Sequence, residues 1–396
     1  MNERIKLVIE FDRRWNYFQW FLFGFYELKN EGKIEIQFKT GPLCNFSFFV
    51  NNKYLSRVIR KLFFKKQIDS YYFDGYIITE GKKKTFTIDC ADTPYMFDYE
   101  RLKNKDIYFK IQYPCDIDKP AFNLTKEIEI PWIDSEDLEP KLRKLKTETY
   151  RREIKDFVKY KSKIKPLMLG PRELSIGNSY SQLKEGYENF ISSYNENKSG
   201  KGMCYFGSAK GPLPSKNIKE PDYGLEYDLL GWFKERINHP NEKRAKLAEL
   251  LGDKRGFDCR VIQNGNADIN CENNKNLYIS LKEFPEHVSK FEYNFNISGY
   301  TLSIPSRFID SFAVGTAVVT DKLHCKWYLP FDKEEVIETI EMGYEPDGVV
   351  DWEAFLADVD KLKKTSPSTI KKLYEKKWAP KVVAQYIINT VIEEGD

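Results

Sequence analysis

Arg307 and Asp310 lie three residues apart in the stretch SIPSRFIDSFAVGTAVVTD and offer a cation and an acid to one ligand. On a helix, residues with this spacing project from neighbouring turns of one face. A guanidinium binds phosphate oxygens with paired hydrogen bonds, and a carboxylate accepts hydrogen bonds from hydroxyl groups. An arginine near a helix start predicts a site for a phosphate, and Asp310 would lie beside it. The structural alternative is a surface ion pair, with Asp310 facing the positive end of the helix.

The residues around this pair predict a short helix, a glycine turn and a buried strand. Pro305 suits a first helical turn, and Ser303 or Ser306 can cap the amides there. Apolar residues then recur at helical spacing, and a glycine follows them. The all-apolar run 317–319 is typical of a strand buried on both faces of a parallel sheet. Free amides at the helix start would add to Arg307 in holding a phosphate.

Two further carboxylates follow predicted strands. Asp12 comes after the strand predicted at residues 5–11, and Asp92 lies in the loop after the strand at 85–89. Ligands of parallel sheets gather beyond the carboxyl ends of the strands, so either acid could serve as a catalytic base. The alternative is that they cap turns, as aspartates in loops commonly do.

A glycine-containing turn is predicted after the strand at residues 203–206. Its residues Gly207, Ser208 and Lys210 are small or cationic, which suits a turn that holds phosphates. The stretch has neither the spacing of a Walker loop nor that of a dinucleotide-binding fingerprint, so the motif is weak by itself.

Composition limits the class of protein. The 396 residues suffice for two domains, and 41% hydrophobic with 31% charged residues is typical of a globular chain. A net charge of +3 argues against a dedicated nucleic-acid binder, although the lysines at 82–84 and 141–165 could rest on an anionic membrane. Seven scattered cysteines and three histidines predict reduced thiols and no metal site. Without a visible secretory signal or membrane span, we expect a cytoplasmic enzyme.

Strands and helices alternate along the chain, which predicts an α/β fold. We expect a first domain over residues 1–170, a second over 171–378, and a closing helix over 379–396 that returns to the first domain. Strands are expected at 5–11, 34–38, 46–50, 75–79, 85–89, 107–111, 203–206, 257–262, 291–297 and 317–319. Helices are expected at 16–30, 55–64, 239–251, 349–362, 368–376 and 379–393, besides the one that carries Arg307.

The central stretch resembles the donor-binding helix and following strand of nucleotide-sugar glycosyltransferases with the GT-B architecture. The matching residues are Asp310, Ala313, Gly315, Ala317, Val318 and Val319. Retaining families usually carry Glu at the position of Asp310 and Pro at that of Ala317. The serines before Arg307 and the Lys326-Trp327-Tyr328 run make the stretch more similar to protein O-glucosyltransferases, capsule-associated transferases or exostosin-like enzymes.

This resemblance implies two Rossmann-like domains facing a cleft and transfer of a sugar to a glycan, lipid-linked or protein acceptor. It implies donor binding by Ser306, Arg307 and Asp310, and places Arg244 on the donor phosphates. No metal or cofactor is expected, since the sequence has no isolated Asp-x-Asp between apolar strands. Two alternatives are a two-domain sugar-nucleotide epimerase and a noncatalytic glycan-binding protein.

Overall fold

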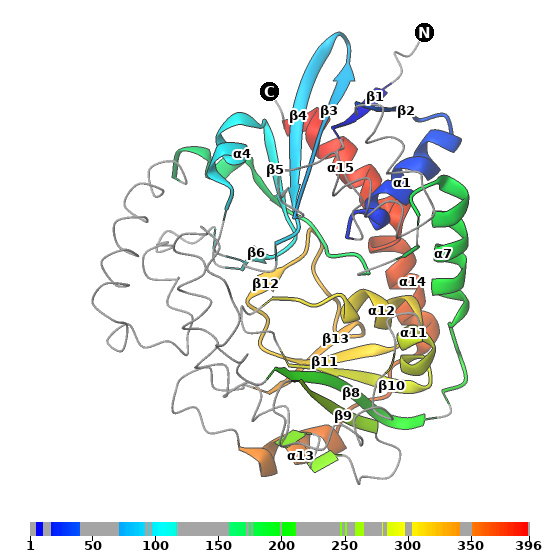
Figure 1. Cartoon of the computed structure of the whole chain (residues 1–396). Coiled ribbons are helices and arrows are strands. Elements are labelled where there is room, and N and C mark those ends of the chain that lie inside the picture. Colours follow the sequence, from blue (N-terminus) through cyan, green and yellow to red (C-terminus); the bar gives the residue numbers. More distant parts are fainter. Residues whose placement is uncertain are drawn as a thin grey trace.

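A computed structural model describes the larger part of the chain. The described residues are 5–10, 17–39, 71–91, 94, 97–115, 117, 158–171, 174–175, 177–198, 200–210, 246–247, 250–251, 258–264, 279, 283–297, 303–340 and 351–394. The fold is α/β, as the sequence predicts, with one mixed sheet and one parallel sheet (Figure 1). The expected strand at 46–50 and helix at 55–64 lie outside the described residues.

The first sheet has the strand order β2-β1-β3-β4-β5-β7. Its strands are β1 (Ile5–Glu10), β2 (Ile34–Phe38), β3 (Tyr72–Thr79), β4 (Lys82–Asp89), β5 (Ile107–Lys110) and β7 (Ile164–Pro166). Helix α1 (Gln19–Asn30) connects β1 to β2, which are parallel, and confirms the predicted strand-helix-strand unit. A short helix, α4 (Tyr99–Asn104), precedes β5.

Strand β3 runs antiparallel to both of its neighbours, which the sequence did not predict. The connection between the strands expected at 75–79 and 85–89 is shorter than expected, because Lys82 and Lys84 belong to β4. The chain turns at Glu80 and Gly81 instead, with φ angles of 50° and 72°. Two consecutive residues with positive φ make the tight hairpin turn whose twist matches that of the strands.

The second sheet has the order β13-β11-β10-β8-β9, and all its strands are parallel. They are β8 (Gly200–Lys210), β9 (Asp258–Asn264), β10 (Phe291–Asn296), β11 (Ala317–Asp321) and β13 (Val336–Ile340). All five residues of β11 are buried, as its apolar run predicts. The strand order reverses direction between β8 and β10, and ligands of such sheets bind at this kind of position.

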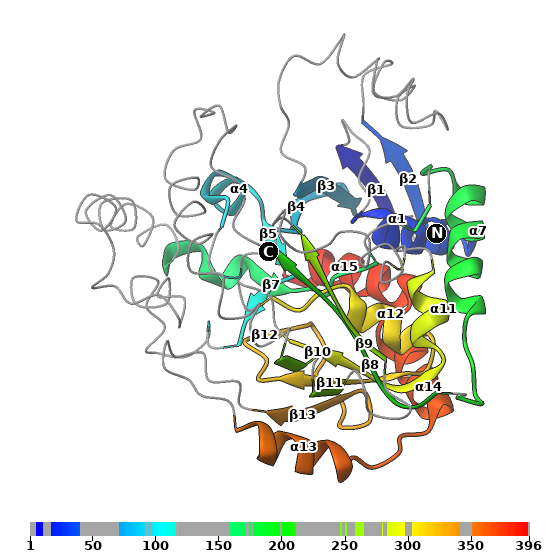
Figure 2. The ribbon, with the colours of Figure 1, turned by 60° about the horizontal axis from the view of Figure 1, so that its bottom comes forward.

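The helices around the two sheets are α7 (Tyr180–Ser192), α11 (Phe284–Val288), α12 (Arg307–Ala313), α13 (Trp352–Asp360), α14 (Pro367–Lys377) and α15 (Pro380–Glu394). Helix α15 packs against α1 on one face of the first sheet (Figures 1 and 2). Lys84 Nζ, buried in β4, donates to the carbonyl oxygen of Ile392 at 2.7 Å. The end of the chain is therefore part of the first sheet's packing.

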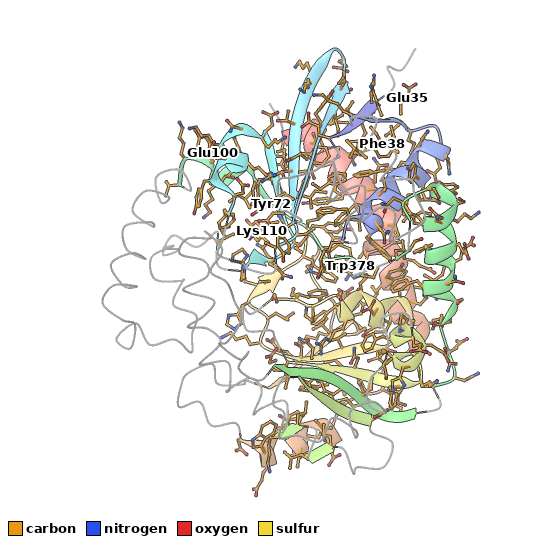
Figure 3. All side chains as sticks on the ribbon, viewed as in Figure 1. Glu35, Phe38, Tyr72, Glu100, Lys110 and Trp378 are labelled. Atoms are coloured by element: carbon orange, nitrogen blue, oxygen red, sulfur yellow. The ribbon has the colours of Figure 1, made fainter. Side chains whose placement is uncertain are left out.

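One hydrophobic core extends through both sheets. Trp378, at the end of α14, lies between the sheets (Figure 3). The centre of its ring is 5.0 Å from the centre of the Trp327 ring. The indole of Trp20 on α1 donates to the Trp378 carbonyl oxygen at 3.1 Å. Because the two sheets share this core, the predicted division into two domains near residue 170 stays a prediction.

Gly24 tests the contact between α1 and α15. A Cβ on this helical glycine would come within 2.1 Å of the Pro380 carbonyl oxygen. In an open helix Gly→Ala stabilises by about 0.5–1 kcal/mol, but overpacking here should destabilise Gly24→Ala by about 1–3 kcal/mol. Urea unfolding followed by tryptophan fluorescence measures the sign. A gain in the free energy of unfolding would contradict the packing of α15 on α1.

Candidate functional site

Helix α12 begins differently from the expectation. The Ser306 hydroxyl makes no capping hydrogen bond, and the backbone of Ser306 is already helical at φ −58° and ψ −22°. The amides of Phe308 and Ile309 bond to the carbonyl oxygens of Pro305 and Ser306, at 3.2 and 3.0 Å. The helix end agrees with the prediction, because Gly315 follows it with a φ of 73°. These two amides are hydrogen-bonded within the turn and are not available to a phosphate. Arg307 is therefore the group on this helix that could bind one.

Asp310 is partly buried, and its protonation differs from the expected charged state. Burial raises its pKa from 3.8 to about 8, and the opposing attraction of the nearby Arg307 is weaker. At pH 7 most of the carboxyl is therefore protonated and can donate a hydrogen bond. This acid with raised pKa beside a guanidinium is typical of a functional site, although structural positions also show it.

The chain before α12 meets the first sheet. Gln112, which follows β5, donates from Nε2 to the Ile304 carbonyl oxygen at 2.9 Å and accepts from the Ile304 amide at 2.9 Å. Gln112 is fully buried, and Ile304 is almost completely so. The segment that follows the carboxyl end of β5 thus contacts the segment that follows the carboxyl end of β10.

A second connection joins the same edges. Strand β6 (Tyr113–Pro114) pairs antiparallel with β12 (Cys325–Lys326), between the two sheets in Figure 1. The Cys115 amide extends this ladder by donating to the His324 carbonyl oxygen at 2.8 Å. Since β12 follows β11, the carboxyl ends of both sheets converge on one region, and Arg307 and Asp310 lie on the helix that begins there.

An ion pair is buried at the end of the first sheet. Lys110 Nζ, at the end of β5, lies 2.8 Å from Asp89 Oδ2, at the end of β4, and both side chains are completely buried. Tyr108 donates its hydroxyl to the same carboxylate at 2.7 Å, and the Ala91 amide donates to Asp89 Oδ1 at 2.8 Å. Figure 3 shows Lys110 beside β6. Sequence reasoning missed Lys110, although a charged residue within the strand predicted at 107–111 was a signal.

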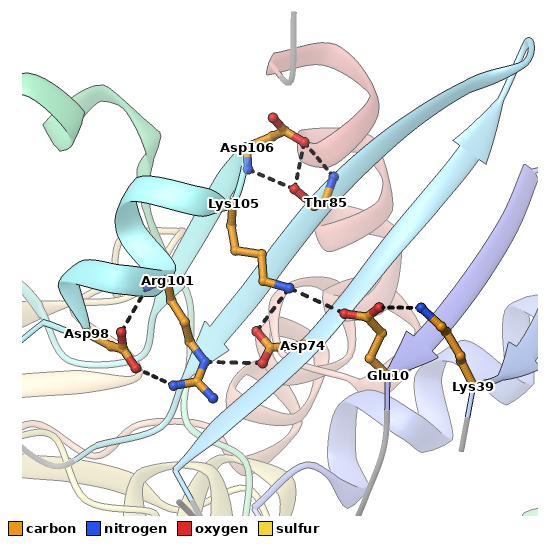
Figure 4. Close-up of polar contacts among 8 residues, drawn as sticks. All are labelled: Glu10, Lys39, Asp74, Thr85, Asp98, Arg101, Lys105 and Asp106. Carbon is orange, nitrogen blue, oxygen red and sulfur yellow. Dashed lines mark hydrogen bonds and ion pairs between the residues drawn. The ribbon is translucent and has the colours of Figure 1, made fainter. Parts of the chain in front are cut away.

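Six charged side chains form a chain of ion pairs across the first sheet (Figure 4). In order they are Lys39, Glu10, Lys105, Asp74, Arg101 and Asp98, with distances of 3.2, 3.4, 3.5 and 3.1 Å before the final Arg101–Asp98 contact. Asp98 also caps α4 by accepting from the Arg101 amide at 2.9 Å. Such a network stabilises more than isolated surface pairs do. It holds the end of β1, from which the segment with Asp12 continues.

Polar side chains also line the end of the second sheet. Asn296 Nδ2, at the end of β10, donates to Thr320 Oγ1 at 3.0 Å, and this hydroxyl lies 3.2 Å from Asp321 Oδ1. All three residues are completely buried. Among the described residues, none donates a hydrogen bond to Asn296 Oδ1. The short buried strand predicted at 317–319 gave no indication of these hydrogen-bonded polar side chains.

The structure changes the expectation for the glycine turn. Gly207, Ser208 and Lys210 continue β8 and pair with Val261, Ile262 and Asn264 of β9. The turn was predicted because small residues interrupt the apolar run, but the strand continues through them. The side chains of these three residues are not among those that the structure describes. Asp12, Asp92 and Arg244 lie outside the described residues altogether.

No protein-family model matches the chain, and no curated protein is significantly similar to it in sequence. No helix in the described part of the chain is long and apolar enough to cross a membrane. Within that same part, no group of three or more His, Cys, Asp and Glu side chains could hold a metal ion. Metal independence therefore remains a prediction.

The buried Lys110–Asp89 pair predicts strong coupling between two substitutions. Lys110→Met leaves a buried carboxylate without its cation, which should cost about 3–5 kcal/mol of unfolding free energy. Adding Asp89→Asn removes that charge, so the double variant should be more stable than Lys110→Met alone. Chemical denaturation of both single variants and the double measures the coupling. The exposed Lys184–Glu188 pair on α7 is the control, since its coupling should stay below about 1 kcal/mol.

The raised pKa of Asp310 predicts how Asp310→Asn changes stability with pH. The folded state keeps its proton up to about pH 8, whereas the unfolded chain releases it near 3.8. The contribution to stability is complete below the unfolded value and is lost as pH rises through 8, by at most about 1.4 kcal/mol per unit. Asparagine cannot ionise, so the variant should gain stability relative to the wild type from pH 5 to 8.

Urea unfolding of both proteins at pH 5, 6, 7 and 8 tests this expectation. Asp358→Asn is the control, because that carboxylate is exposed on α13 and contacts Lys361 at 3.6 Å. Parallel profiles for wild type and Asp310→Asn would show that Asp310 ionises normally.

Proposed function

We propose that the protein is a glycosyltransferase of GT-B architecture that moves a sugar from a nucleotide-sugar donor to a glycan, lipid-linked or protein acceptor. The observation that carries the proposal is the convergence of both sheets' carboxyl ends on the segment before α12. Gln112 and Ile304 meet there at 2.9 Å. A donor and an acceptor bound at the ends of two different sheets would be brought together in this region.

The order of the second sheet supports the donor side of the proposal. A parallel sheet with this order is doubly wound, of the flavodoxin-like kind, and ligands of such sheets bind where the order reverses. Here that position lies between β8 and β10, and α12 follows β10. The return of α15 to α1 also agrees with the proposed architecture, in which a final helix crosses back to the first domain.

Arg307 and Asp310 then have distinct roles. The Arg307 guanidinium neutralises the diphosphate, whose negative charge grows as the bond to the sugar breaks. Asp310, protonated at neutral pH, donates a hydrogen bond to a phosphate or sugar oxygen and does not repel the diphosphate. This replaces the charged acceptor that the sequence suggested.

The other candidates complete the proposed site. Lys210 ends β8 next to the reversal point, and Gly207 and Ser208 precede it in the same strand. Arg244 is proposed to contact the donor phosphates, and Asp92 or Asp12 would be the base if the enzyme inverts. No metal takes part in this proposal, and the site is proposed to work in the cytoplasm. Of the lysines at 82–84, the exposed Lys82 and Lys83 are proposed to touch an anionic membrane, whereas Lys84 is buried.

Binding of nucleoside diphosphates tests the proposal. Uridine and guanosine diphosphates should raise Tm, and Arg307→Ala should weaken the binding by about 1.5–3 kcal/mol, the range for a charged hydrogen bond. Lys372→Ala is the charge-matched control, because Lys372 is exposed on α14. Without nucleotide, both variants should melt like the wild type.

Failure of both nucleotides to bind the wild type would sink the proposal and leave a noncatalytic role. If a nucleotide binds, incubation with a labelled nucleotide sugar, first alone and then with acceptor, separates transfer from epimerisation. Epimerisation changes the donor without any acceptor, whereas transfer depends on one.

A further inference from the structure

We propose that Gln112 is a positioning residue, whose amide fixes the chain that leads into α12 and thereby the places of Arg307 and Asp310. Gln112 lies two residues beyond β5, and Ile304 lies three residues before α12. The inference rests on the proposed function for what Arg307 and Asp310 do. The geometry of α12 can be tested independently of that function.

The side-chain amide imitates a neighbouring strand. It offers one donor and one acceptor to the carbonyl oxygen and the amide of a single residue, and both distances are 2.9 Å. Because Gln112 is completely buried, water cannot replace either bond. An isosteric apolar side chain would leave both backbone groups of Ile304 without this partner.

The anchor is rigid on the side of the first sheet. Gln112 follows Ile111, whose amide donates to the Asp89 carbonyl oxygen at 3.1 Å and whose side chain is completely buried. The buried Lys110–Asp89 pair joins the two strand ends just before it. The position of Gln112 is therefore set by β4 and β5, and not by the loop that it holds.

The constraint passes directly into the helix. Pro305, the residue after Ile304, accepts from the Phe308 amide at 3.2 Å, within the first turn of α12. Freeing Ile304 thus frees the beginning of the turn that carries Arg307. The pairing of β6 with β12 holds the two sheets together independently. Loss of the Gln112 amide should consequently loosen α12 locally without separating the sheets.

Hydrogen exchange measured by mass spectrometry tests this local effect. In Gln112→Met, the amides of residues 303–313 should exchange at least about tenfold faster than in the wild type. Gln19→Met is the matched control, since the buried Gln19 amide bonds in the same manner to the backbone of Ser175, Gly177 and Leu174. It should loosen that loop only. Unchanged exchange in 303–313 for Gln112→Met, or equal acceleration in the control, overturns the proposal.

Gln112→Glu adds a rescue that a general loss of packing would not show. A protonated carboxyl donates to the Ile304 carbonyl oxygen and accepts from its amide, whereas a carboxylate cannot donate. After correction for intrinsic exchange, residues 303–313 should behave as in the wild type at pH 5 and as in Gln112→Met at pH 8. This comparison still decides the matter if the methionine variant does not fold. Equal pH dependence in both variants overturns the proposal.

Calorimetry with uridine and guanosine diphosphates connects the geometry to the site. Gln112→Met should weaken binding by about five- to tenfold, while Gln19→Met should leave it unchanged. If α12 loosens and nucleotide affinity stays the same, the positioning role is overturned. If neither nucleotide binds the wild type, the proposed function is overturned, and the exchange data alone decide whether Gln112 positions α12.

Discussion

The packing of aromatic side chains between the sheets is the constraint on which the rest of the structure depends. Phe308 and Phe312 of α12 contact Trp327, whose ring also contacts that of Trp378. Burying one such side chain contributes about 1.5–3 kcal/mol, so the cluster is a substantial part of a typical domain's stability. Because it joins α12 to the helices that return to the first sheet, the orientation of α12 is set by core packing. The same orientation determines how Arg307 and Asp310 are solvated.

Hydrogen bonds and ion pairs then supply what apolar packing cannot, namely a single register between the two sheets. An apolar surface can slide with little loss of contact, whereas the Gln112 amide fits only one backbone position. The buried Lys110–Asp89 pair has the same character, since removing two charges from water offsets much of their attraction. Our hypothesis is that both are retained for specificity at the junction and contribute little to net stability.

Sequence reasoning succeeded where short-range rules decide the structure. Gly315 and the apolar run after it predicted the end of α12 and the buried β11, because one positive-φ residue and one buried run suffice. It failed where the deciding contact is distant. Lys84 lies just before the strand expected at 85–89, but a carbonyl oxygen 308 positions later accepts a hydrogen bond from its ammonium group, which makes a buried strand position possible. The partner of Gln112 lies 192 positions away, so spacing alone could not predict it.

Asp310 shows how packing changes the chemistry that a residue type suggests. By sequence it was a carboxylate beside an arginine, and the ordinary expectation was a charge pair. In the structure the cost of desolvation exceeds the attraction of Arg307, so the stable form near neutral pH is the neutral acid. A buried acid lowers stability as pH rises, and a neutral polar residue would avoid that loss. Its position beside a guanidinium, at the junction of two sheets, supports the proposed ligand site.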